Sequence, residues 1–132
     1  MKAKRFGVSL EEKLLKDLDN FVKEHKFPNR SQAISLLIRK NLVEEAWEKN
    51  KKVWGTLVLI YNHHKRELVN KSLDIQHDFS YIIISSQHVH LDHNNCLEII
   101  VLSGKAIELK KFSDRLISLK GIKYGKLVMT AT

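Results

Sequence analysis

Two predicted strands meet across the stretch HVHLDHNNCLE, residues 88–98, which decides the fold of the second half of the chain. Residues 81–91 and 96–103 are rich in Ile, Val and other residues that favour strands. The Asp and Asn residues between them favour a turn. We therefore predict a β-hairpin whose loop is either residues 92–94 or residues 91–95.

Strands and helices surround this hairpin in a regular order. The segments outside it are a strand over 53–61, a helix over 64–77, a helix over 106–120 closed by Gly121, and a strand over 122–129. The resulting order is β-α-β-β-α-β, which is that of a ferredoxin-like split β-α-β unit. We assign this unit to residues 53–132.

The chain begins with a short alternating segment, residues 5–10. On one side it carries the apolar Phe6, Val8 and Leu10, and on the other Arg5, Gly7 and Ser9. This alternation is typical of a half-buried strand. Because one isolated strand cannot pair its own backbone, we expect a second copy of the chain to supply the partner strand. Phe6 and Val8 then face inward, and the basic and hydroxyl-bearing side faces outward.

Two helices are predicted after this segment. Ser9 and Glu12 have the spacing of a capping box, and Pro28 ends the first helix. Asn29 with Gln32 predicts the start of the second helix. We therefore expect an α+β protein with a strand-helix-turn-helix domain over 1–50 and a second domain over 53–132.

The composition excludes several classes of protein. The chain has 132 residues, of which 43% are hydrophobic and 29% charged, as in a soluble globular protein. No apolar run approaches the roughly 20 residues that cross a bilayer, and no signal peptide follows the basic start, so we expect a cytoplasmic protein. The single cysteine, Cys96, excludes an internal disulfide. A net charge of +8 favours a polyanionic partner.

A ribbon of two paired N-terminal strands suits double-stranded DNA. Such a ribbon fits the major groove, where Arg5 can donate two hydrogen bonds to guanine and Ser9 can pair with several bases. The helix start at Asn29, Arg30 and Ser31 offers free amides to a phosphate. The simpler alternative is a basic tail followed by an ordinary helix cap.

His88, His90 and Cys96 form a candidate metal site. Side chains two residues apart on a strand share a face and lie about 7 Å apart. If the hairpin loop holds an odd number of residues, Cys96 lies opposite His90 on that same face. Imidazole and thiolate favour zinc, copper or nickel over magnesium or calcium, and spacing alone does not distinguish among the three. Any one of the seven histidines taken alone is more often structural than a ligand.

Three motifs together resemble the NikR family of nickel-responsive transcriptional regulators. They are RFGVSL at 5–10, NRSQ at 29–32 and the His-x-His-x5-Cys-Leu-Glu pattern at 88–98. The resemblance covers nearly the whole chain. It implies an N-terminal ribbon-helix-helix domain that forms an intertwined dimer, a C-terminal ACT-type domain, and a homotetramer built as a dimer of dimers.

The resemblance also implies roles for individual residues. In the family, each subunit binds one Ni(II) in a square plane of three His and one Cys, which correspond here to His77, His88, His90 and Cys96, with His77 supplied by another subunit. Gln76 and Glu98 match positions that support the ligands by hydrogen bonding. Lys65 and Arg66 match residues that touch the DNA backbone. Gly7 departs from the family, which carries Thr or Ser there, and glycine has no side chain to offer a base.

The expected function is that of a nickel-dependent regulator which binds palindromic operator DNA and represses nickel uptake genes. One alternative is a ribbon-helix-helix regulator that senses a small molecule or a different transition metal. A metalloenzyme is the other alternative, but the stretch Cys96-Leu97-Glu98 holds one carboxylate and no convincing general base. We therefore expect a protein without enzymatic activity.

Overall fold

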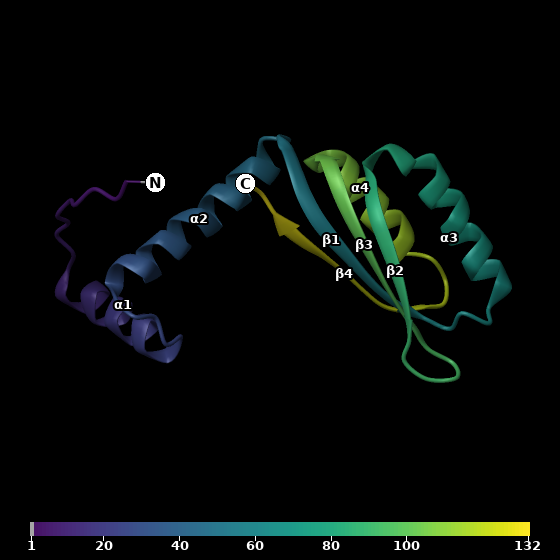
Figure 1. Ribbon diagram of the computed structural model, residues 1–132, viewed down its shortest axis with the longest axis horizontal. Coiled ribbons are helices and arrows are strands. Elements are labelled where there is room, and N and C mark those ends of the chain that lie inside the picture. Colours follow the sequence, from purple (N-terminus) through teal and green to yellow (C-terminus); the bar gives the residue numbers. More distant parts are fainter. Residues whose placement is uncertain (1) are drawn as a thin grey trace. The chain divides into compact units, whose positions relative to one another are not determined.

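Residues 2–132 are described in a computed structural model, in which contacts divide the chain into two compact units (Figure 1). The first unit ends at Asn41, and the second is Leu42–Thr132. The elements are α1 (Glu12–Glu24), α2 (Arg30–Glu48), β1 (Lys52–Tyr61), α3 (Arg66–Asp78), a 3-10 turn (Ser80–Ile82), β2 (Ile83–His90), β3 (Cys96–Lys105), α4 (Ala106–Ile117) and β4 (Ile122–Thr130). Among the helices of residues 2–132, none combines the length and the apolar character that crossing a membrane requires.

The first unit contains α1 and the N-terminal part of α2. Residues 2–11 form neither helix nor strand in the single chain, so intermolecular pairing of residues 5–10 stays a prediction. The predicted capping box is wrong, because α1 begins at Glu12 and its N-cap, Glu11, makes no side-chain cap. The Asn29 cap is confirmed, since the amide of Gln32 donates to Asn29 Oδ1 at 2.9 Å.

The second unit has the predicted β-α-β-β-α-β order. Its four strands form one sheet in the order β2-β3-β1-β4 (Figure 1), and every neighbouring pair is antiparallel. The strands β1 and β2 are therefore parallel to each other and separated by β3, as a split β-α-β unit requires.

One face of this sheet packs against the helices. Leu57 and Leu59 of β1 and Ile100 of β3 are fully buried, together with Leu109 and Phe112 of α4. Cross-strand pairing extends this buried face to the end of β1, where Tyr61 lies opposite Cys96 and Leu59 opposite Glu98. The helix-covered face therefore brings a thiol and a carboxyl group into the interior.

The last turns of α2 belong to the second unit. Trp47 is only 3% exposed, and its indole Nε1 donates to the carbonyl oxygen of Thr130 at 3.0 Å. The following turn is also bound to this unit, because Asn50 Oδ1 accepts the amide of Ile107 at 2.8 Å. The boundary between the two contact units consequently lies within α2, and the domain assignment 1–50 and 53–132 stays a prediction. Polarity alone does not reveal that the turn at Asn50 binds the start of α4.

Replacement of Trp47 by Ala should lower the free energy of unfolding by roughly 3–5 kcal/mol, because it removes a buried aromatic side chain and leaves a cavity. Denaturant unfolding followed by circular dichroism measures this loss. Trp47→Phe is the matched control, since it keeps most of the packing and loses the indole hydrogen bond, and its cost should be clearly smaller. A loss below about 1 kcal/mol for Trp47→Ala would contradict the docking of α2 onto the second unit.

Candidate functional site

The register of β2 and β3 determines which side chains share a face of the hairpin. His90 lies opposite Cys96, and His88 lies opposite Glu98, so the loop is residues 91–95. The odd loop therefore places both imidazoles on the same face as the thiol. Within the loop, the amide of Leu91 donates to the carbonyl of Asn95 at 2.9 Å.

Burial differs sharply between the two strands. Cys96 is 2% and Glu98 is 1% exposed, whereas His88 and His90 on the edge strand β2 are exposed. The hairpin thus presents two imidazoles at the surface and a thiol and a carboxyl group just beneath them. A cation held by these groups would lie at the boundary between the core and the surface.

Three side chains from three elements bind the buried Glu98. The hydroxyl of Tyr61 donates to Oε1 at 2.8 Å, and Nε2 of Gln76 donates to Oε2 at 3.1 Å. Nε2 of His88 also lies 3.1 Å from Oε2. A buried carboxyl group is costly unless its oxygens find such partners. Glu98 thus contacts His88 directly and Gln76 contacts Glu98, while the support of metal ligands by these two residues stays a prediction.

Tyr61 is the residue of this network that sequence reasoning missed. It ends a strand that is otherwise largely aliphatic, and a buried hydroxyl requires a partner. A tyrosine at the end of an aliphatic strand was the one sign in the sequence that this position has a polar partner. The sequence does not show that Tyr61 pairs with Cys96 across the sheet. Burial and the hydrogen bond to Glu98 raise the pKa of Tyr61 above its ordinary value, so the neutral hydroxyl acts as a donor.

The surroundings of Cys96 favour its protonated form. Burial, and then the charge of Glu98, raises the pKa of Cys96 above its ordinary value. A metal ion would therefore have to displace this proton, because the thiolate is the form that binds metals. The donor chemistry of one sulfur and several imidazoles fits a late first-row transition metal.

The candidate ligands are not clustered in the described part of the chain. Within residues 2–132, no three side chains of His, Cys, Asp or Glu are grouped closely enough to hold a metal ion. His77 is exposed near the end of α3, directly after the residue that binds Glu98. Consecutive side chains of a helix diverge by about 100°. While Gln76 points to Glu98, His77 is therefore directed elsewhere.

The predicted DNA-contacting residues lie in both units. Arg5, Gly7 and Ser9 are exposed in the segment before α1, and open space surrounds the position of a Cβ on Gly7. Lys65 is the N-cap of α3, and Arg66 is its first residue.

At the start of α2, Ser31 is exposed and Asn29 caps the helix. The guanidinium of Arg30 is already engaged, since its Nε and Nη2 donate to the two carboxylate oxygens of Asp19 at 2.7 and 2.9 Å. The amides at this helix start can therefore meet a phosphate directly, whereas the Arg30 side chain would first have to leave Asp19.

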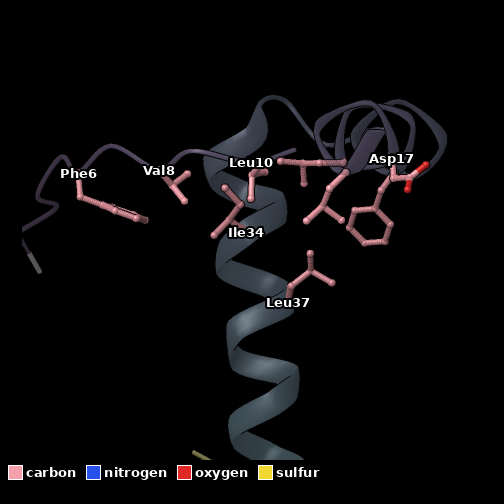
Figure 2. A pocket seen from close by; sticks show the side chains of 9 residues that line it. Phe6, Val8, Leu10, Asp17, Ile34 and Leu37 are labelled. Carbon is pink, nitrogen blue, oxygen red and sulfur yellow. The ribbon is translucent and has the colours of Figure 1, made fainter. Parts of the chain in front are cut away.

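An apolar groove runs along the first unit. It has a volume of about 400 Å³, and Figure 2 shows Phe6, Val8 and Leu10 along one side, with Ile34 and Leu37 of α2 beside them. Phe6 is 76% and Val8 is 62% exposed in the single chain. Two side chains that the alternation predicted to face inward thus lack a cover within the chain itself.

Tyr61→Phe should lower the free energy of unfolding by about 1.5–3 kcal/mol, because it leaves one oxygen of a buried carboxyl group without its donor. Tyr81→Phe is a closely matched control: the Tyr81 hydroxyl donates to Glu108 at 2.7 Å, but Tyr81 is exposed and Glu108 is only partly buried. The control should change the stability by less than about 0.5 kcal/mol. Equal losses in the two variants, measured by denaturant unfolding, would contradict the role assigned to burial.

Known proteins give an independent view of this arrangement. Residues 54–130 match the family model described as the NikR C terminal nickel binding domain. A protein of Thermococcus kodakarensis is 50% identical over all of this chain and 96% of its own length, and one of Geobacter sulfurreducens is 51% identical over 97% of this chain and 93% of its own. The names of both describe them as nickel-responsive regulators.

A solved structure agrees with the fold of the second unit. An uncharacterized protein from Thermotoga maritima aligns with a TM-score of 0.55 and 18% identity, over 60% of this chain and 98% of that one. At this identity the likeness concerns the fold alone. The extent and identity of the sequence matches, together with the His-Cys hairpin, show that the chain belongs to the NikR family of nickel-responsive regulators.

Proposed function

We propose that the protein is a nickel-dependent transcriptional repressor without enzymatic activity. It binds palindromic operator DNA when Ni(II) occupies its second unit, which is of the ACT type, and it controls genes for nickel uptake. The observation that carries this proposal is the β2-β3 register, which places His88, His90 and Cys96 on one face in a member of this family.

The proposed ligands are His88, His90 and Cys96 of one subunit and His77 of another, with one Ni(II) per subunit. The geometry at His88 supports a specific binding mode. Because its Nε2 lies 3.1 Å from Glu98, Nδ1 is the nitrogen that remains for the metal. Bound nickel would supply the bridge between subunits, while Tyr61 and Gln76 hold Glu98, which in turn orients His88.

Two uncovered apolar surfaces support a homotetramer. In the first unit, a second copy would fill the groove beside Phe6 and Val8 by pairing its own residues 5–10 with them. In the second unit, Val89, Tyr124 and Val128 are exposed on the sheet face that the helices do not cover. Two chains that pair through their first units would form a dimer. Two such dimers that join through their second units would form a dimer of dimers.

The proposed DNA interface begins at the paired N-terminal segments. Arg5 and Ser9 face the bases, and the amides at Asn29–Ser31 and the side chains of Lys65 and Arg66 meet backbone phosphates. Nickel can favour DNA binding only by stabilising the DNA-competent arrangement more than the others. A metal that joins His77 of one subunit to the hairpin of another has this property, because it constrains how subunits are arranged.

Titration of the purified protein with Ni(II) should give one ion per subunit and a thiolate-to-metal absorption band. Cys96→Ala should lose this band, because Cys96 is the only sulfur ligand available from cysteine. His93→Ala, which alters a histidine of the hairpin loop, is the control and should keep the band. An unchanged spectrum in Cys96→Ala would remove Cys96 from the site.

Arg5→Ala should weaken binding to the operator by about 1–3 kcal/mol if Arg5 donates to a guanine. The measurement is a gel shift with Ni(II) at fixed salt, on the operator and on random DNA of the same length. Lys4→Ala, one residue away, is the control and should weaken binding to both DNAs to a similar extent. Equal losses on both DNAs for Arg5→Ala would show that Arg5 touches only phosphate.

A further inference from the structure

Three histidines outside the proposed ligand set form a chain of contacts that starts at His90. They are His63, two residues after the end of β1, its neighbour His64, and His93 in the hairpin loop. The rings of His63 and His90 are stacked, with centroids 4.4 Å apart and planes only 7° apart. His64 lies against His63 at 4.1 Å and bonds the carbonyl of His93 through Nε2 at 2.9 Å.

We infer that His63 is a positioning residue for the nickel ligand His90. Its ring stacks on the His90 imidazole and holds it in the rotamer that faces the same side of the hairpin as Cys96. This inference rests on the proposed function, because it concerns a residue of the proposed nickel site. It gives a role to a histidine that neither the spacing of the ligands nor the Glu98 network uses.

The position of His90 explains why it needs such a support. His90 is exposed and is the last residue of the edge strand β2, which has a neighbouring strand on one side only. An exposed side chain ordinarily exchanges among several staggered rotamers. His88 contacts Glu98, and Cys96 is buried in the core, whereas the His90 ring stacks on His63.

The parallel planes distinguish positioning from direct ligation. The lone pair of an imidazole nitrogen lies in the plane of its ring, so a bound ion also lies in that plane. In two rings that are stacked face to face at 4.4 Å, the lone pairs lie in separate parallel planes and do not converge on one ion. In this arrangement His63 supports the ring of His90 and does not share its metal.

The same chain of contacts extends to the hairpin loop. The β1-β3 pairing places Tyr61 opposite Cys96, and two residues later the chain reaches the ring of His90. His64 then connects His63 to the loop through the His93 carbonyl. The end of β1 therefore contacts the hairpin at both its buried and its exposed groups.

Three variants of the full-length protein test the inference: His63→Phe retains a stacking ring without nitrogen, while His63→Leu and His63→Ala remove the ring. His25→Ala, in the first unit, controls for loss of a histidine. The first readout needs no metal: NMR of the His90 ring protons should show ring-current shifts in wild type and His63→Phe that disappear in His63→Leu and His63→Ala. The second is nickel affinity by competition with a chelator. It should fall about 10-fold or more in His63→Leu and His63→Ala, and less than about 3-fold in His63→Phe and the control.

Two results would overturn the inference. Nickel affinity that falls as far in His63→Phe as in His63→Ala would mean that a nitrogen of His63 is required. His63→Leu keeps an apolar side chain in this space, so it should fold. If its His90 chemical shifts and its nickel affinity equal those of the wild type, the stack has no effect. Cys96→Ala in the same titration separates this outcome from failure of the proposed function: if it binds nickel as the wild type does, the proposed site itself is wrong.

Discussion

The five-residue loop between β2 and β3 is the constraint on which the candidate site depends. Side chains alternate between the two faces of a strand, so a change of one residue in the register would move every side chain of β2 to the other face. With the loop at residues 91–95, His90 faces Cys96 and His88 faces Glu98. The separate β1-β3 pairing aligns Cys96 with Tyr61 of β1, so that three strands contribute to one side of the sheet.

Glu98 is the hydrogen-bonding centre of this side of the sheet. A carboxyl group that is 1% exposed requires partners, and it finds them in Tyr61 of β1, Gln76 of α3 and His88 of β2. Four elements therefore meet at one carboxyl group. In this account the protein builds the surroundings of the proposed ligands from its own hydrogen bonds, while the ligands themselves are not grouped closely enough, within residues 2–132, to hold an ion. The stack of His63 on His90 extends this principle to the exposed ligand.

Sequence patterns predicted much of the second unit and less of the contacts between its elements. The order of strands and helices and the hairpin follow from local periodicity, and the structure has them. The shared face of His88, His90 and Cys96 depends on a loop with an odd number of residues, which periodicity does not fix and which the observed register supplies. Tyr61 and His63 were missed because their importance arises from pairing across the sheet, which local spacing does not encode. The prediction of a capping box is wrong because the spacing of Ser9 and Glu12 does not show where the helix begins. The N-cap is Glu11 and not Ser9. The burial of Trp47 likewise depends on a contact with Thr130, far away in the sequence.

The central claim is that one hairpin presents two imidazoles and a thiolate to a single nickel ion. X-ray absorption at the nickel edge, on the full-length protein loaded with one equivalent of Ni(II), tests this claim most directly because it identifies the atoms around the metal. The account predicts one sulfur and three nitrogen neighbours in a planar arrangement. A nickel ion surrounded only by nitrogen and oxygen would contradict it, since Cys96 would then lie outside the site.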